Sequence, residues 1–270
     1  MKKFEGMILA CDMDGTLLDN NRQISPRNQQ ALRYFTQEGG RFSLATGRAP
    51  QAIECYIPQL PFNAPYSLLN GSLILDEKHH VLHCAGMPES TKDLIEITLS
   101  EFSQLGCEIF AGAQVLIRKM SDVTENHIKV LDMKYSMVTQ EELGDTAGWC
   151  KINFTGDPAL MHSVREFLKP YTDDRFCIAS SLASFCEITA HGVNKGTALQ
   201  QIAASCGIAA DHTFAIGDSY NDEPMLEAAH IGFAPANADD GILKTADVVV
   251  CANDKDAVAN AIEYMEAHFC

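Results

Sequence analysis

The sequence predicts an α/β fold, a Rossmann-like core with a parallel sheet that is interrupted by an inserted α+β domain. Short apolar strands alternate with helical segments up to about residue 84, and the same alternation returns after residue 190. Between these points the pattern changes to runs of paired strands with separate helices, which is typical of an α+β domain. Continuous apolar strands between helices indicate a parallel sheet covered on both faces. We therefore expect a core of residues 1–84 and 191–270 and an inserted domain of residues 85–190.

The first part of the core begins with a buried strand at residues 7–11, "MILAC". The helix that follows has clear ends, because Ser25 can cap its N-terminus, Pro26 suits the first helical position and Gly39-Gly40 can end it. Further elements are expected in the order strand 41–46, helix 50–56, strand 66–70 and a hairpin at 71–83 around the polar turn "DEKHH".

The remaining elements follow from the same apolar periodicities. In the inserted domain we expect helices at 89–106, 122–132 and 157–171, and strands at 107–112, 114–120, 150–156, 175–181 and 184–190. In the second part of the core we expect helices at 195–208, 223–230, 240–246 and 254–268, and strands at 213–218, 231–235 and 247–250.

Composition excludes several classes of protein. The formal net charge is −16 and no basic patch stands out, which argues against nucleic-acid binding. No apolar stretch approaches the ~20 residues that a membrane-spanning helix needs, and the short apolar run near the N-terminus lacks the features of a signal peptide. The ten cysteines show no CxxC pair and no zinc spacing. We expect a cytoplasmic protein without a nucleic-acid or membrane partner, and the sequence makes no prediction of its oligomeric state.

Polar residues follow each core strand, at the edge of a parallel sheet where ligands bind. Asp12, Asp14 and Gly15 follow the first strand, and Asp12 and Asp14 can face one ligand because residues i and i+2 of an extended chain share a side. The other such residues are Thr46, Gly47 and Arg48 after the second strand, Asn70 and Gly71 after the third, Asp218, Asn221 and Asp222 after the strand "TFAIG", and Lys195 where the chain re-enters the core.

This collection of side chains suits phosphoryl chemistry. Several carboxylates at one place favour a hard divalent cation such as Mg²⁺, which binds oxygen ligands and often substrate phosphate. Thr46 and Lys195 can bind a phosphoryl group and stabilise its charge during transfer. A carboxylate can act as the nucleophile and form an aspartyl-phosphate.

Four motifs, "DMDGTLL", "ATGR", "NKG" and "GDSYND", occur in this order and resemble those of the haloacid dehalogenase superfamily of phosphatases. The domain inserted between the second and third motifs is similar to the large cap of the Cof-type subfamily, and so are the segments "NGSLILD" and "EITAHGVNKGTAL". The resemblance covers essentially the whole chain. It implies a phosphatase whose cap domain, residues 85–190, sets substrate specificity.

The resemblance also implies roles for the catalytic residues. Asp12 would attack phosphorus and carry the phosphoryl group, while Asp14 would protonate the leaving oxygen and then activate water. Thr46 and Lys195 would bind the transferred phosphoryl group. The metal would be Mg²⁺, held by the Asp12 carboxylate, the backbone carbonyl of Asp14 and the Asp218 carboxylate, with Asp222 supporting the site through water.

Gly47, Arg48 and Asn221 are the expected substrate-binding residues on the same resemblance. The sequence departs from the family at two positions, because Asp256 stands in "NDKDAV" where the family usually has glycine, and Pro235 stands in "FAPANADD" where glycine is also usual. Both departures concern local loop geometry and leave the catalytic set complete.

The most direct prediction is therefore a Mg²⁺-dependent phosphatase that hydrolyses small phosphorylated metabolites, with sugar phosphates as the default substrate class. Two alternatives stay open at this point. One is a phosphomutase or phosphotransferase on the same fold, in which the aspartyl-phosphate passes to a sugar hydroxyl instead of water. The other is a non-catalytic module that binds phosphorylated ligands.

Overall fold

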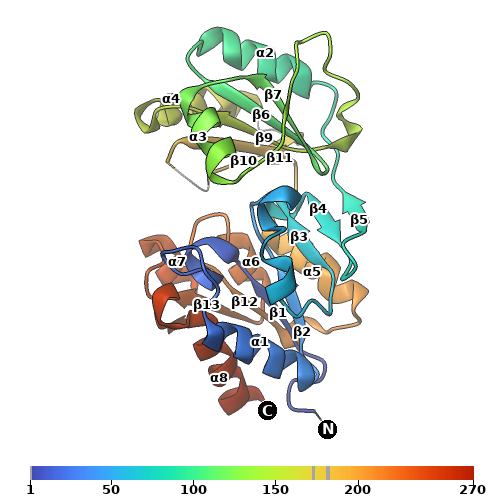
Figure 1. Ribbon diagram of the computed structural model, residues 1–270, viewed down its shortest axis with the longest axis vertical. Helices are drawn as coiled ribbons and strands as arrows, with labels where there is room; N and C mark the ends of the chain where they lie inside the picture. The colour runs from blue at the N-terminus through green and yellow to red at the C-terminus, as the bar shows by residue number, and fades with distance from the viewer. Residues whose placement is uncertain (1, 172–173, 181–182) are drawn as a thin grey trace. The chain divides into compact units, whose positions relative to one another are not determined.

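The computed structural model describes residues 2–171, 174–180 and 183–270, and the chain divides into two compact units (Figure 1). Unit 1 comprises Met1–Thr46, Cys55–Leu82 and Asn194–Cys270, and unit 2 comprises Gly47–Glu54 and His83–Val193. The chain therefore crosses from one unit to the other four times, and each unit is built from segments that are far apart in the sequence.

Unit 1 is built on a five-stranded parallel sheet with the strand order β14-β13-β12-β1-β2. The central strands pair the start of the chain with its last third, as Figure 1 shows for the blue and orange strands β1 and β12. The five strands are β1 (Ile8–Cys11), β2 (Arg41–Leu44), β12 (Thr213–Ile216), β13 (Ile231–Pro235) and β14 (Val248–Val250). The parallel sheet predicted for the core is thus present.

Helices cover both faces of this sheet, and side-chain alternation along the strands explains why. Ile8 and Ala10 of β1 belong to an apolar cluster formed with α5 (Lys195–Ser205), α6 (Glu223–Ala228) and α7 (Asp240–Thr245). Phe214 points to the opposite face and packs at a ring-centroid distance of 5.1 Å against Phe269 of α8 (Ala257–Phe269). The first helix, α1 (Pro26–Gln37), packs beside α8. A strand that is buried on both faces has a continuous apolar sequence, as "MILAC" does.

A small three-stranded sheet follows β2 along the chain. It contains β3 (Tyr66–Leu68), β4 (Leu73–Leu75) and β5 (Val81–Cys84), and the predicted hairpin is formed by β4 and β5. Strands β3 and β4 lie in unit 1, and the chain passes into unit 2 within β5. A parallel bridge between Ala45 and Ser67 connects β3 to the segment after β2.

Local signals predicted the starts of the α-helices better than their C-terminal ends; α2, for example, ends at Glu101 rather than at the predicted residue 106. The Ser25 side chain accepts a hydrogen bond from the backbone N–H of Asn28, so Ser25 caps α1 as expected. The helix predicted at 50–56 is wrong, because only two short helical turns are present, at Pro50–Ile53 and Ile57–Gln59. Residues 54–56 between them form a turn. So short a segment takes its conformation from tertiary packing rather than from its own helix propensity.

Unit 2 is an α+β unit with a six-stranded sheet in the order β10-β11-β9-β6-β7-β8. Its pairs are antiparallel except β7 with β8. The strands are β6 (Gly106–Ala111), β7 (Gln114–Lys119), β8 (Ser136–Met137), β9 (Trp149–Thr155), β10 (Phe176–Ala179) and β11 (Phe185–Ala190). The two-residue strand β8 was not predicted, and the end of the strand predicted at 175–181, Ser181, lies outside the described residues.

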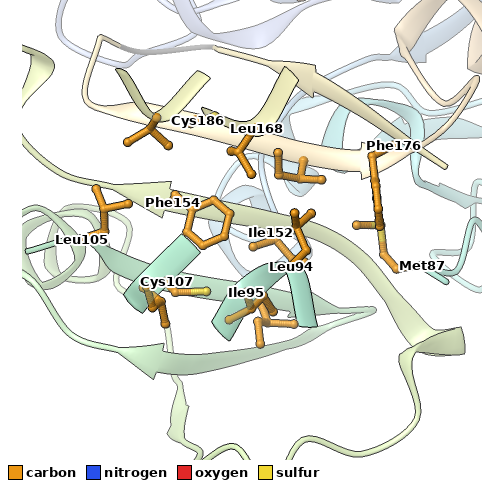
Figure 2. Packing of buried hydrophobic residues seen from close by; sticks show 14 of the residues in the cluster. Met87, Leu94, Ile95, Leu105, Cys107, Ile152, Phe154, Leu168, Phe176 and Cys186 are labelled. Atoms are coloured by element: carbon orange, nitrogen blue, oxygen red, sulfur yellow. The ribbon is translucent and has the colours of Figure 1, made fainter. Parts of the chain in front are cut away.

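One face of the unit 2 sheet is apolar and packs against α2 (Thr91–Glu101) and α4 (Pro158–Leu168). Figure 2 shows this core, in which Ile152 and Phe154 of β9 meet Leu94 and Ile95 of α2. The opposite face is polar. There Asn153 of β9 donates to Glu108 of β6 at 2.9 Å, and α3 (Asp122–Val130) contributes His127 to the same carboxylate.

No helix in the described part of the chain combines the length and the apolar character that crossing a membrane requires. All ten cysteines are free thiols.

Candidate active site

The ends of β1, β2 and β12 lie level with one another at one edge of the unit 1 sheet. Cys11, the last residue of β1, is in register with the last residue of β2 and with the last residue of β12. The segments that follow these three strands therefore start at the same edge, where ligands bind in open parallel sheets. Asp12, Thr46 and Asp218 are the polar residues that this register places there.

A buried lysine pairs with two carboxylates at this edge. Nζ of Lys195 donates to Oδ1 of Asp12 and to Oδ1 of Asp222, each at 2.5 Å. Lys195 is the first residue of α5, whose N-terminus is fixed by a capping box in which Asn194 and Thr197 exchange hydrogen bonds. The Lys195 side chain has no exposed surface, so its charge depends on these two partners rather than on water.

Asp222 also shapes the turn after β12. Its Oδ2 accepts hydrogen bonds from the backbone N–H groups of Asp218 and Ser219, both at 3.0 Å. The turn needs glycine at position 217, because a Cβ there would lie 2.4 Å from Cγ of Asp222. Both oxygens of the Asp222 carboxylate are thus engaged by protein donors.

Asp218 completes a cluster of three carboxylates. Thr16 donates to its Oδ1 at 2.8 Å. Asp12, Asp218 and Asp222 can each offer one oxygen atom, and these atoms lie within 4.8 Å of one another. Three carboxylates face the single ammonium group of Lys195, which is the charge pattern that a divalent cation relieves.

The pKa values report the same imbalance of charge. Burial raises the pKa of Asp12 well above its usual range, and the neighbouring charge of Asp222 adds to this effect. Burial, followed by the charge of Asp222, raises the pKa of Asp218 to about 6. Burial alone would lower the pKa of Lys195, but the charges of Asp12 and Asp222 outweigh it and hold the pKa above its usual value. The lysine therefore stays charged, while burial and mutual repulsion destabilise the ionised forms of Asp12 and Asp218.

The turn at residues 13–17 brings the two neighbouring aspartates to different environments. Asp12 is 5% exposed, Met13 is fully buried, and Asp14 is exposed with an extended backbone (φ −79°, ψ 125°). Gly15 follows with φ 76°, and a Cβ at this position would lie 2.3 Å from Oδ2 of Asp218. Only glycine satisfies both the left-handed backbone and the close approach to this carboxylate.

Thr46 and Asn221 are connected through Asn70. The backbone N–H of Asn70 donates to the carbonyl of Thr46 at 3.1 Å, and its side-chain oxygen accepts from Nδ2 of Asn221 at 3.1 Å. Asn70 has a left-handed backbone (φ 58°), which asparagine adopts more easily than most residues. The end of β3 thereby ties the segment after β2 to the segment after β12.

Gly47 and Arg48 belong to unit 2 rather than to unit 1. The carbonyl of Gly47 accepts a hydrogen bond from Nζ of Lys151 at 2.9 Å, and Arg48 is buried with Nη1 donating to the carbonyl of Ala52 at 2.9 Å. The structure therefore brings together Asp12, Asp218, Asp222 and Lys195, and links Thr46 with Asn221.

The sequence pattern of the haloacid dehalogenase-like hydrolases matches residues 9–262 of the chain. The chain belongs to this family. Among curated relatives, phosphatase YwpJ of Bacillus subtilis is 27% identical, with 96% of this chain and 99% of the relative covered. Pyridoxal phosphate phosphatase YbhA of Escherichia coli is 28% identical, with 94% of this chain and 97% of the relative covered.

The architecture agrees with the family assignment. The solved structure of a haloacid dehalogenase-like hydrolase from B. subtilis aligns with a TM-score of 0.83 at 25% identity, covering 100% of both chains. The expected resemblance and fold class are confirmed. The expected class of enzyme, a phosphoric monoester hydrolase, is confirmed as well, since the relatives of this haloacid dehalogenase-like chain are named phosphatases. The roles of the individual site residues stay predictions.

Two functional contacts were missed from the sequence. No binding or catalytic role was predicted for Thr16, yet Thr16 donates a hydrogen bond to the Asp218 carboxylate. Asn237 was given no role, yet its Nδ2 donates to the carbonyl of Gly15 at 2.8 Å. The available signal for Asn237 was its place just after β13, because the other polar site residues likewise follow core strands such as β1, β2 and β12.

The departure at position 256 has a structural explanation. Asp256 adopts a left-handed backbone (φ 69°, ψ 47°), the conformation for which glycine is the usual choice. Ser25 donates to its side-chain oxygen at 2.5 Å. The aspartate thus occupies the glycine conformation and gains a contact with the cap of α1. The other departure, Pro235, is the last residue of β13.

Replacing Gly15 with alanine is expected to lower both stability and activity. The left-handed backbone alone costs a Cβ-bearing residue about 1 kcal/mol, and the clash with Asp218 adds to this cost and displaces the carboxylate. The matched control is Gly207→Ala, because Gly207 has φ 67° but no atom within 4 Å of an added Cβ. Urea denaturation should show the greater loss for Gly15→Ala, and equal losses would contradict the close approach to Asp218.

The raised pKa of Asp218 predicts a pH dependence of stability in protein kept free of metal with a chelator. The folded state holds the Asp218 proton up to about pH 6, whereas the unfolded chain releases it near its ordinary value of 3.8. The folded state therefore binds more protons in this window, so this group's contribution to stability falls as the pH rises from about 4 to 6. An asparagine at position 218 has no proton to release, so Asp218→Asn lacks this loss of stability. The unfolding free energy of the variant minus that of wild type should therefore increase as the pH rises from about 4 to 6. A flat or falling difference would contradict the raised pKa.

Proposed function

We propose that this chain is a Mg²⁺-dependent phosphatase that hydrolyses small phosphomonoesters, sugar phosphates or similar metabolites, through an aspartyl-phosphate on Asp12. The observation that carries the proposal is the pairing of Asp12 with the buried Lys195 inside a cluster of three carboxylates. The charge of Lys195 opposes the rise in the pKa of Asp12 that burial and Asp222 cause, and a bound divalent cation would oppose it further. Both effects favour the ionised carboxylate, which is the form that can attack phosphorus.

In the first step, an oxygen of Asp12 forms a bond to phosphorus while the bond from phosphorus to the ester oxygen breaks. Asp14 gives its proton to the departing oxygen, so that an alcohol leaves. Lys195 and Thr46 hold the phosphoryl group during the transfer. Asp14 suits the proton transfer because it is exposed, whereas Asp12 is nearly buried and bound to Lys195.

In the second step, the Asp14 carboxylate accepts a proton from water, and the water oxygen attacks phosphorus. The bond between phosphorus and the Asp12 oxygen breaks, which releases inorganic phosphate and restores the Asp12 carboxylate. Asp14 thereby acts first as an acid and then as a base. One carboxyl group can serve both steps, because the first step consumes its proton and the second step returns one.

The residues of the site fit a magnesium ion. Oxygen atoms of Asp12, Asp218 and Asp222 lie within 4.8 Å of one another, and their three negative charges exceed the one positive charge of Lys195. Asp12, Asp218 and the backbone carbonyl of Asp14 would hold the ion directly. Asp222 would reach it through water, because both its oxygens already accept hydrogen bonds from Lys195 and the turn after β12. Bound Mg²⁺ would supply positive charge beside the phosphoryl oxygens.

We infer that unit 2 sets substrate specificity, with residues 85–190 as the cap domain and residues 1–84 and 191–270 as the catalytic core. Two features support this. Unit 2 carries the buried Arg48 only two residues after Thr46 in the chain. Its sheet also has a polar face on which buried Lys151 pairs with Glu187 at 3.3 Å, groups that suit hydroxyl-rich substrates better than apolar ones. Gly47, Arg48 and Asn221 are proposed to contact substrate.

Small phosphorylated metabolites are the proposed substrate class because the relatives act on such compounds. One is a pyridoxal phosphate phosphatase, and another, from B. subtilis at 27% identity, is a 5-amino-6-(5-phospho-D-ribitylamino)uracil phosphatase.

The experiment is a phosphate-release screen over a panel of phosphomonoesters, with Mg²⁺ present or replaced by a chelator. We expect turnover of p-nitrophenyl phosphate and of a few metabolite esters, dependent on Mg²⁺, with inorganic phosphate equal to the alcohol released. Transfer of the phosphoryl group to a sugar without free phosphate would favour a phosphomutase or phosphotransferase. Binding of phosphate esters without turnover of any of them would favour a non-catalytic module.

A further inference from the structure

Two cysteines of unit 2 place their thiols in direct contact. The Sγ atoms of Cys84 and Cys150 lie 3.0 Å apart and share a hydrogen bond, although the residues are 66 positions apart in the chain. Cys84 is the last residue of β5, and Cys150 is the second residue of β9. Neither residue has a role in the proposed phosphatase mechanism.

The backbone around both thiols is fixed by contacts between residues 84–87 and residues 146–150. The N–H of Met87 donates to the carbonyl of Thr146 at 3.1 Å, and Oγ1 of Thr146 donates back to the carbonyl of Met87 at 2.8 Å. Gly86 lies so close that an added Cβ would be 2.3 Å from the carbonyl oxygen of Ala147. The approach of the two sulfurs therefore follows from the packing of two chain segments and not only from side-chain rotamers.

The two thiols are chemically unequal. Cys84 is partly exposed, and the hydrogen bond with Cys150 lowers the pKa of Cys84 to about 7. Cys150 is buried, and its pKa is raised by the hydrogen bond with Cys84 and by burial. A thiol with accessible surface and substantial thiolate character at neutral pH is the form that reacts with oxidants, and a second thiol beside it can resolve the product.

We propose that Cys84 and Cys150 form a site of reversible oxidation, in which hydrogen peroxide or an organic hydroperoxide converts the dithiol to a disulfide. The thiolate of Cys84 attacks one peroxide oxygen, the O–O bond breaks, and hydroxide or alkoxide leaves. Cys84 is then a sulfenic acid. The sulfur of Cys150 attacks the sulfur of Cys84, the S–O bond breaks, and the hydroxyl group leaves with the Cys150 proton as water. A dithiol reductant reverses the change by thiol–disulfide exchange.

The Cys84–Cys150 disulfide would form close in sequence to a point where the chain passes from one unit to the other. The chain passes from unit 1 to unit 2 between Leu82 and His83, inside β5, and Cys84 is the second residue after that crossing. A covalent link from Cys84 to β9 would prevent residues 84–87 from separating from residues 146–150. Opening of this segment should therefore be suppressed in the oxidised protein.

The test treats the whole protein with hydrogen peroxide at pH 7, blocks remaining thiols with an alkylating agent, and maps peptides without reduction. We expect a peptide pair linked through Cys84 and Cys150, lost on treatment with dithiothreitol. Cys84 should be consumed about tenfold faster than the exposed Cys55, because about half of it is thiolate at this pH against a few per cent for an ordinary thiol. Hydrogen exchange should slow across residues 81–87 in the oxidised form only.

The control variants separate this site from general cysteine oxidation. Cys84→Ser and Cys150→Ser should each abolish the linked peptide, whereas Cys206→Ser, at a thiol of similar partial exposure, should leave it unchanged. Oxidation that leaves Cys84 and Cys150 unlinked in wild-type protein, or that links Cys84 to another cysteine, would overturn the proposal. These readouts need no turnover of a phosphate ester, so they stand or fall independently of the proposed phosphatase activity.

Discussion

Replacing Asp12 with asparagine is expected to reduce the turnover of p-nitrophenyl phosphate by about 10⁴-fold or more. The amide has nearly the shape of the carboxylate but cannot attack phosphorus, so the chemical step loses its nucleophile. Folding should survive, because burial disfavours the charged form of Asp12 and the neutral amide avoids that cost while keeping an oxygen toward Lys195. Initial rates with saturating Mg²⁺ and a urea melt of the same preparation measure the two effects.

The matched control is Asp211→Asn, an exposed aspartate on the turn before β12. It should keep wild-type turnover. Near wild-type turnover by Asp12→Asn would contradict the assignment of Asp12 as the nucleophile. The urea denaturation curve would reveal a variant that fails to fold, so that a folding defect is not mistaken for a catalytic one.

Replacing Lys195 with methionine is expected to lower the free energy of unfolding by about 3–5 kcal/mol and turnover by about 10²–10³-fold. Lys195 is the cation that contacts both buried Asp12 and Asp222. Removing it leaves those carboxylates without their partner in a region that excludes water, and breaking a buried pair costs more than the pair contributed. The measurement is chemical denaturation at pH 7 in the presence of a chelator, since a bound cation could replace part of the missing charge.

Two further variants make this prediction specific to the buried cluster. Lys255→Met removes a lysine whose side chain is 73% exposed and whose nearest carboxylate oxygen lies 3.8 Å away, and it should change stability by less than about 0.5 kcal/mol. The double variant Lys195→Met with Asp222→Asn removes one of the uncompensated charges and should recover at least about 1 kcal/mol. A Lys195→Met protein as stable as wild type, or a double variant no better than the single one, would contradict the role assigned to this ion pair.

The parts of the fold that the sequence predicted are those governed by local signals. The alternation of apolar strands and helices predicted the parallel sheet, and Ser25 with Pro26 predicted the start of α1. The segment 50–56, expected to be a helix, forms only a short helical turn, because so short a segment takes its conformation from tertiary packing rather than from its own propensity. The short strand β8 could not be predicted, because two exposed residues carry no periodicity and pair only through their tertiary neighbours.

In the candidate site too, local signals predicted which residues take part, but not which residues they contact. Strand-end positions pointed to Asp12, Thr46 and Asp218, since parallel strands end at one edge. The partners of these residues depend on distances between segments far apart in the chain. Lys195 contacts both Asp12 and Asp222, and Thr16 binds Asp218 across 202 positions. No spacing in the sequence could show that Asp222 has both oxygens occupied by protein donors.

The most direct test of the central claim is to trap the phosphoryl group on Asp12. In Asp14→Asn, the nucleophile is intact but the group that activates water is missing, while p-nitrophenolate leaves without needing a proton. We expect a burst of nitrophenolate close to one equivalent per chain, followed by slow turnover. After acid quenching, peptide mapping should find the phosphoryl group on Asp12, and hydroxylamine should remove it as it does from acyl phosphates. A variant that turns over without a burst, or a phosphoryl group on any other residue, would contradict catalysis through Asp12.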